Sequence, residues 1–311
     1  MTENLIDDVL NTNFNATNHR NAYSFMTQLI TWFLVFITCY VVAQLISGSI
    51  IYYYYKTASL KTIATQVNDL NVLRIAQMLA SLIGFGLPAY LFCKWKGISF
   101  LSYSRANVGF SYLLIIIVPL LLISFYPFIN VTFFINKWIG FDTVSKSSQA
   151  EYKLLVNALL KDNSSFVLVL NVITIAIIPA IAEEWLFRGS FQRLLSEKLN
   201  IHLSVFLASI LFSIIHLEFS GFISRIALGM FLGYLFYYSG SLWTSIFAHA
   251  INNGAQVILM YLYNNGKYNT DVDKMEMPTV VQFIAYTISF IALWLVFLRI
   301  VQKRKNSTFA E

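Results

Sequence analysis

Long apolar runs separated by short polar segments form the dominant pattern along this chain. Most of these runs are long enough to cross the hydrocarbon core of a bilayer as one α-helix, which takes about 20 residues. The pattern therefore predicts an all-α fold, a polytopic transmembrane helix bundle of about eight spans. The expected spans are residues 25–55, 75–92, 108–135, 166–195, 201–217, 222–238, 242–262 and 280–300.

Polar segments divide this bundle into four parts. Residues 1–24 are rich in Asn and Thr and form a tail that has no core to join. Residues 25–165 comprise the first three spans and a long polar connection, in which residues 151–160 suit an amphipathic surface helix. Residues 166–263 form a core of four spans, and residues 264–311 form the last span and a basic tail.

Composition supports a membrane protein and argues against nucleic acid as a partner. Hydrophobic residues make up 58% of the chain and charged residues 12%, a balance that a water-soluble domain does not reach. The net charge of +6 comes mostly from Lys and Arg beside the spans, so nucleic acid is not an expected partner. Their distribution predicts cytoplasmic termini in a plasma or inner membrane. Cys39 and Cys93 lie in apolar runs, so no disulfide framework is expected, and no pattern indicates an oligomeric state.

Two glutamates and an arginine interrupt the apolar run of the fourth span. A carboxylate in hydrocarbon costs several kcal/mol, so such groups are paired, face water or take part in chemistry. Glu184 and Arg188 are four residues apart and share a helical face, which favours a charge pair and leaves Glu183 free. Pro179 removes a backbone hydrogen bond one turn earlier and predicts a bend there.

Counting residues from the polar turn after this span brings an acid and a histidine together. Glu183 lies 16 residues before Leu199, and His216 lies 17 residues after it. At about 1.5 Å per residue both lie roughly 25 Å from the turn, so they can meet across the helix pair. Phe212 shares a face with His216 and is expected to flank its ring.

The seventh span repeats this spacing with His249 and Asn253, which can donate hydrogen bonds together as an oxyanion hole does. A lone membrane histidine more often joins two helices than catalyses a reaction, and paired glutamates at a helix end are often solvated surface. The convergence of several ionisable groups on three spans favours chemistry over these alternatives.

Other polar and small residues have structural interpretations. Gly229 and Gly233 form a Gly-x-x-x-Gly face that lets a neighbouring helix approach closely. Glu218 and Arg225 flank a short connection and are expected to form an ion pair. Neither pair is expected to take part in catalysis.

Three short motifs therefore carry the candidate chemistry, and they stand on three different spans. Together they resemble the CAAX protease and bacteriocin-processing family, also called CPBP or Abi, and within it the type II CAAX prenyl endopeptidases. The resemblance covers about residues 167–256. The motifs read Glu183-Glu184-x-x-x-Arg188, Phe212-x-x-x-His216 and His249-x-x-x-Asn253.

The resemblance implies an intramembrane endopeptidase that hydrolyses a peptide bond of a membrane-associated or lipidated peptide or protein. Glu183 is then expected to activate the attacking water as general base, and His216 to hold or polarise that water. His249 and Asn253 would stabilise the tetrahedral oxyanion. The supporting residues are Glu184, Arg188 and Phe212.

A metal is an open alternative, because members of this family are often labelled metalloproteases. Glu183, His216 and His249 would supply three zinc ligands and leave one position for water. That arrangement would use the best candidate base as a ligand, so no cofactor is expected and zinc remains the alternative. Two other function classes stay open: a non-catalytic membrane scaffold or bacteriocin-immunity-type protein of the same fold, and a transporter.

Overall fold

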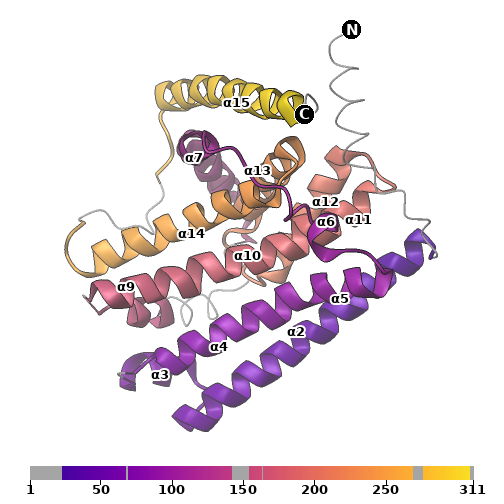
Figure 1. The fold of residues 1–311 in the computed structure, drawn as a ribbon. Helices are drawn as coiled ribbons and strands as arrows, with labels where there is room; N and C mark the ends of the chain where they lie inside the picture. Colours follow the sequence, from indigo (N-terminus) through magenta and orange to yellow (C-terminus); the bar gives the residue numbers. More distant parts are fainter. Residues whose placement is uncertain (1–22, 68, 142–153, 163, 269–275, 309–311) are drawn as a thin grey trace.

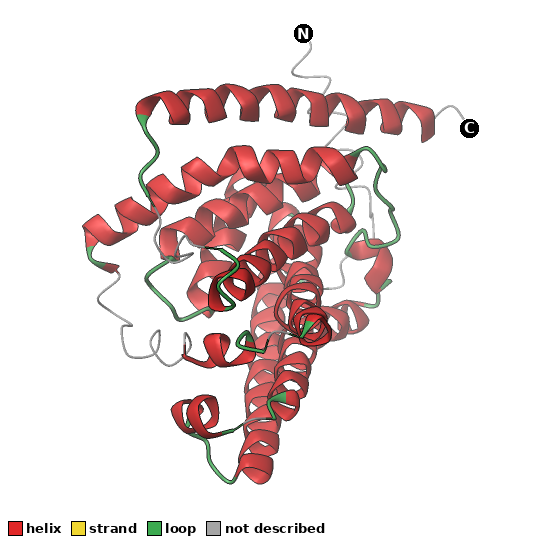
Figure 2. Cartoon of the chain, turned by 90° about the vertical axis from the view of Figure 1, so that its left-hand side faces the viewer, coloured by secondary structure: helices red, strands yellow, loops and turns green. Residues whose placement is uncertain are grey.

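The computed structural model describes residues 23–67, 69–141, 154–162, 164–268 and 276–308. Within these ranges every regular element is a helix, and Figure 2 shows no strand among them. The predicted all-α fold is confirmed. Residues 1–22 of the predicted tail and residues 151–153 of the predicted surface helix lie outside the described residues. Residues 154–159 of that predicted helix are helical.

All eight predicted spans are helical, and six of the described helices are long and apolar enough to cross a membrane. The fifth, α12, is a shorter apolar helix, and the seventh, α14, is interrupted by polar side chains. The chain is therefore an integral, multi-pass membrane protein. The helices in chain order are α2 (Phe25–Tyr55), α3 (Leu60–Gln66), α4 (Asn71–Ser81), η1 (Leu82–Gly86), α5 (Leu87–Lys96), α6 (Phe100–Tyr103), α7 (Leu114–Ile139), α9 (Ser165–Asn171), η3 (Val172–Ile177), α10 (Ile178–Glu184), η4 (Trp185–Gln192), α11 (Arg193–Ser196), α12 (Ile201–Ile215), α13 (Phe222–Ser239), α14 (Leu242–Asn264) and α15 (Val280–Thr308).

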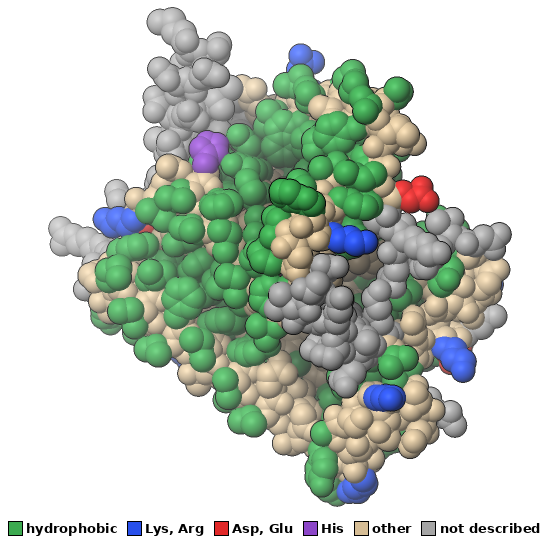
Figure 3. All heavy atoms as spheres, turned by 180° about the vertical axis from the view of Figure 1, so that it is seen from behind, with side chains coloured by type: hydrophobic (Ala, Val, Ile, Leu, Met, Phe, Trp, Pro, Cys, Tyr) green, Lys and Arg blue, Asp and Glu red, His purple; other side chains and the backbone are tan. Residues whose placement is uncertain are grey.

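The helices form successive layers (Figure 1). Helices α2, α4 and α5 pack together along one side, the span from α9 to α11 lies next to α14 in the middle, and α7 and α15 lie on the other side. Hydrophobic side chains cover a broad area of the outer surface in Figure 3. Because lipid tails are as apolar as these side chains, this surface suits contact with hydrocarbon. The ionisable groups of the fourth span lie inside the bundle.

The fourth span runs without a break from Ser165 to Ser196, but its winding changes along its length. Two π-helical segments, η3 and η4, flank the α-helical turns of α10. Pro179 is the second residue of α10, two positions after η3 ends, so a wider helical turn precedes the proline at which a bend is predicted. Such segments occur frequently at functional sites, and here they flank both glutamates.

Aromatic packing fixes α2 against the span that carries these glutamates. The rings of Trp32 and Phe191 lie 4.4 Å apart between centroids. Trp32 also donates a hydrogen bond of 2.9 Å from Nε1 to the hydroxyl of Ser190. Both the apolar area and the polar end of the indole are thus satisfied inside the bundle.

The Gly-x-x-x-Gly face of α13 allows close helix contact, as predicted. A Cβ atom added to Gly229 would lie 2.9 Å from the Cβ of Ser209, and one added to Gly233 would lie 2.9 Å from Cγ1 of Val205. Both neighbours belong to α12, so these two helices approach to a distance that only glycine permits. The contact fixes the direction of α12 and therefore the place of His216 at its end.

A charged cluster marks the other end of α12, at the turn after the fourth span. Glu197 accepts hydrogen bonds from Lys96 at 2.5 Å and from the hydroxyl of Tyr103 at 2.9 Å. Burial and the positive charge of Arg193 lower the pKa of nearby Arg105 to about 10. Cations outnumber acids among these five residues, in keeping with the predicted cytoplasmic side, which stays a prediction.

Candidate active site

Six of the seven predicted site residues come together where α10, η4, α12 and α14 meet. The fourth span contributes three of them, α12 contributes two through its last turn and C-terminal cap, and α14 contributes one. Direct contacts of α10 with α14 and of η4 with α12 bring these elements together. The six are Glu183, Glu184, Arg188, Phe212, His216 and His249.

Glu184 is the centre of the buried part of this site. Its Oε1 accepts a hydrogen bond of 2.6 Å from Arg188 and one of 2.9 Å from Nδ1 of His249. Arg188 also donates to the carbonyl oxygen of Gly229 at 3.0 Å. Glu184 is 0% exposed and Arg188 1% exposed, so their predicted pair is confirmed as a buried one. The contact of Glu184 with His249 was not predicted from sequence.

Glu183 lies on the other side of the His249 ring. Its Oε2 is 3.7 Å from Nε2 of His249, so the two nitrogens of this ring lie near two different glutamates. Glu183 also interacts electrostatically with His216. The residue count from the polar turn placed Glu183 and His216 at one depth, and their interaction agrees with it.

The hydrogen bonds of the two histidines determine which nitrogen carries the proton in the neutral ring. Nδ1 of His216 lies 2.7 Å from the carbonyl oxygen of Phe212, which only accepts, so Nδ1 donates. Nδ1 of His249 donates to Glu184 in the same way. In the neutral rings both Nε2 atoms therefore have a lone pair to offer water or a polar hydrogen. To donate from Nε2, His249 must carry both protons.

The ring of Phe212 contacts more of the site residues than its sequence spacing indicated. Its ring centroid lies 4.8 Å from that of His216, as the four-residue spacing predicted, and also 5.7 Å from that of His249. The guanidinium carbon of Arg188 lies 4.9 Å from the same ring, within the range of a cation–π contact. One phenyl ring thus orients two histidines and a cation.

Asn253 follows His249 by one helical turn on α14 and is half-buried. Its Oδ1 accepts a hydrogen bond of 3.1 Å from Nδ2 of Asn252. This bond orients the amide and leaves its Nδ2 hydrogens for another acceptor. The sequence motif does not include Asn252, so this hydrogen bond was not predicted and is seen only in the structure.

The three candidate zinc ligands are Glu183, His216 and His249. No group of three or more His, Cys, Asp or Glu side chains lies close enough to hold a metal ion among the residues that the structure describes. The arrangement pairs Glu184 with two donors and places Glu183 beside His249.

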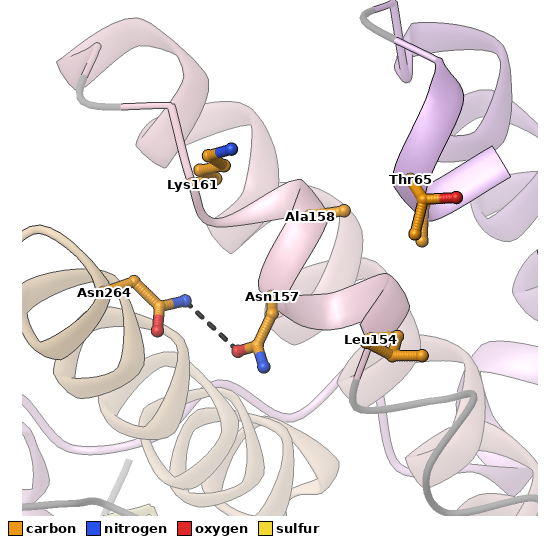
Figure 4. Close-up of a pocket in the computed structure, with 7 residues that line it drawn as sticks. Thr65, Leu154, Asn157, Ala158, Lys161 and Asn264 are labelled. Carbon is orange, nitrogen blue, oxygen red and sulfur yellow. Dashed lines mark hydrogen bonds between the residues drawn. The ribbon is translucent and has the colours of Figure 1, made fainter. Parts of the chain in front are cut away.

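A pocket of about 330 Å³ lies away from this site (Figure 4). Asn264 and Asn157 face each other across part of it and form a hydrogen bond of 3.2 Å from Nδ2 to Oδ1. None of the candidate residues lines it. The lining residues are Ala64, Thr65, Leu154, Asn157, Ala158, Lys161 and Asn264.

Comparison with known proteins agrees with the geometry. Residues 165–255 match the family model described as type II CAAX prenyl endopeptidase Rce1-like, which is a protease family. The match contains all three motifs, from Glu183 to Asn253. No curated protein and no solved structure gives a significant match to this chain. Residues 165–255 of this chain are thus similar to the type II CAAX prenyl endopeptidase Rce1-like family.

Proposed function

We propose that this chain is an intramembrane endopeptidase that hydrolyses a peptide bond of a membrane-associated or lipidated peptide or protein. One observation carries the proposal: Oε2 of Glu183 lies 3.7 Å from Nε2 of His249 on another helix, and the ring of Phe212 contacts the rings of both His249 and His216. A carboxylate beside an imidazole can accept a proton from water while donors stabilise the product of attack. The family match supports a protease.

In the proposed reaction, Glu183 takes a proton from a water molecule as the water oxygen attacks the carbonyl carbon of the peptide bond. Nε2 of His216 accepts the second hydrogen of that water and fixes its direction. The carbonyl oxygen becomes an oxyanion, which accepts hydrogen bonds from Asn253 and from doubly protonated His249. Collapse of this intermediate breaks the C–N bond, and the proton held by Glu183 passes to the leaving amine.

The buried group of Glu184 and Arg188 acts on this reaction through His249. The hydrogen bond from Nδ1 to Glu184 fixes the ring so that Nε2 points toward Glu183. Arg188 in turn holds Glu184 in place through the 2.6 Å contact. The pair is thus proposed to orient the oxyanion donor and to leave Glu183 available as the base.

The proposed mechanism uses no metal, because Glu183 is needed as the base. The proposed partners are a peptide or protein substrate and the surrounding bilayer, with both termini in the cytoplasm and the chain in a plasma or inner membrane. Cysteine-labelling from each side of the membrane at introduced terminal cysteines tests that orientation. Labelling of either terminus from outside would reverse it.

The decisive experiment assays the purified protein in lipid nanodiscs on two internally quenched peptides. One carries a farnesylated CAAX sequence, and the other is the same peptide without the lipid. Glu183→Gln and His216→Ala are expected to lower the cleavage rate by about 10²–10⁴-fold, the usual contribution of a general base or acid. Wild-type cleavage of both peptides would mean that the lipid is not required.

His202→Gln is the matched control, because His202 lies on the same helix, is exposed and bonds only the hydroxyl of Tyr234 at 2.9 Å in the described structure. It is expected to keep wild-type activity. Folded Glu183→Gln and His216→Ala proteins that cleave as well as wild type would refute the peptidase proposal and favour the non-catalytic scaffold.

A further inference from the structure

The loop that joins α12 to α13 begins directly after His216. Leu217 has a φ of 52°, in the left-handed region that branched and bulky residues seldom adopt. The chain therefore turns sharply at the residue next to the candidate catalytic histidine. Such a backbone conformation persists only where surrounding contacts hold it in place.

Asn136, near the end of α7, supplies those contacts. Its Nδ2 donates to the carbonyl oxygens of Phe219 and Ser220, each at 2.8 Å, and its Oδ1 accepts from the backbone N–H of Ile223 at 3.1 Å. Both amide hydrogens and the amide oxygen are thus used on one short loop. The side chain is 0% exposed, so these bonds have no competition from bulk water.

The same loop carries charge next to His216. Glu218 forms an ion pair with Arg225, as predicted from sequence, and Ser220 donates a hydrogen bond to Glu218. Arg225 acts electrostatically on His216. The position of the loop therefore determines both the backbone direction at His216 and the distance of a cation from its ring.

Asn136 lies outside the segment that matches the protease family, residues 165–255. Within that segment the loop has its own tie, from the hydroxyl of Ser213 to the carbonyl oxygen of Phe222 at 2.7 Å. The Ser213 bond holds the far end of the loop, and the N–H of Phe222 also donates to the carbonyl oxygen of Phe219 at 3.3 Å. From outside the segment, α7 holds the carbonyl groups of both Phe219 and Ser220 through Asn136.

We propose that Asn136 is a positioning residue of the active site, which holds the loop after His216 and thereby fixes the place of that ring. This inference rests on the proposed peptidase function. Without the Asn136 amide, the carbonyl oxygens of Phe219 and Ser220 and the N–H of Ile223 each lose a hydrogen bond, and the loop relaxes around Leu217. A displacement of about 1 Å at a reacting group can lower a rate by about 10²-fold.

Two substitutions test the proposal. Asn136→Asp has the same shape and keeps the acceptor for Ile223, but it turns an acceptor oxygen toward the two carbonyl groups. Asn136→Leu removes all three bonds. Ser124→Ala is the matched control, because Ser124 is also buried on α7 and bonds only the carbonyl oxygen of Leu121 in its own helix.

The measurements are kcat and KM on the farnesylated CAAX peptide, amide hydrogen exchange of residues 217–223, and modification of His216 by diethyl pyrocarbonate. Both Asn136 variants are expected to lower kcat at least tenfold with KM within about twofold, to speed exchange in this loop alone, and to change the modification rate of His216. Ser124→Ala is expected to change none of them.

Wild-type kcat in both Asn136 variants would overturn the proposal, as would faster exchange spread over the whole chain, since that indicates general destabilisation. If the wild-type protein cleaves neither peptide, the proposed function fails instead. In that case the test of Asn136 depends on hydrogen exchange of residues 217–223 and on the modification rate of His216. If neither changes in the Asn136 variants, the proposal that Asn136 positions this ring is overturned.

Discussion

Replacing Glu184 with glutamine removes the charge that balances Arg188 inside the bundle. Glu184 is 0% exposed and Arg188 1% exposed, and they lie 2.6 Å apart. Breaking a buried ion pair by removing one partner costs about 3–5 kcal/mol, because the other charge stays buried without compensation. We expect Glu184→Gln to lower the free energy of unfolding by about that amount.

A second substitution isolates the pair from other effects of the change. Arg188→Met removes the cation, and the double variant with Glu184→Gln buries neither charge. The double variant should therefore be more stable than the sum of the single losses predicts, with a coupling energy of about 0.5–3 kcal/mol. Glu218→Gln is the control, because its pair with Arg225 is partly exposed and such pairs contribute about 0–1 kcal/mol.

The assay is reversible unfolding in mixed micelles with increasing sodium dodecyl sulfate, followed by the fluorescence of the six tryptophans. Comparing the four proteins of the cycle at one micelle composition gives the coupling energy directly. A Glu184→Gln loss no larger than that of Glu218→Gln, together with zero coupling, would show that the pair is not buried as described.

Two further predictions use the same protein preparations. Gly229→Ala should lower the free energy of unfolding by about 1–3 kcal/mol, because its Cβ would lie 2.9 Å from Cβ and 3.2 Å from Cα of Ser209. Gly48→Ala has no atom within 4 Å of its new Cβ and should be neutral or stabilising, so equal losses for the two would contradict this packing. Peptide cleavage should persist within twofold after treatment with a strong chelator. Loss of activity that added zinc restores would instead make Glu183, His216 and His249 metal ligands.

Much of the architecture follows from sequence because it depends on local patterns. The apolar runs located the helical regions of all eight predicted spans, since helix length in a bilayer is set by hydrocarbon thickness. The contacts Glu184–Arg188 and Phe212–His216 lie within one helix, where a spacing of four residues puts two side chains on one face. The small residues of α13 likewise predicted a close helix contact.

The π-helical winding of the fourth span could be predicted only in part from the sequence. Pro179 predicted an irregularity, but the extent of the two π-helical segments does not follow from that one residue. A π-helical turn is less favourable than an α-helical one and persists where packing of neighbouring helices stabilises it. The contacts of these segments with α14 and α12 provide that packing.

The sequence by itself determined which residues lie on which helix and which of them share a face. Only the tertiary structure decided the contact between Glu184 and His249, 65 residues apart, and that between Asn136 and the loop after His216. Both depend on the rotation and axial shift of one helix against another, which are set by side-chain packing at the interface. Helical periodicity predicts the face that each helix buries, but the partner atoms that meet it are determined by the packed bundle.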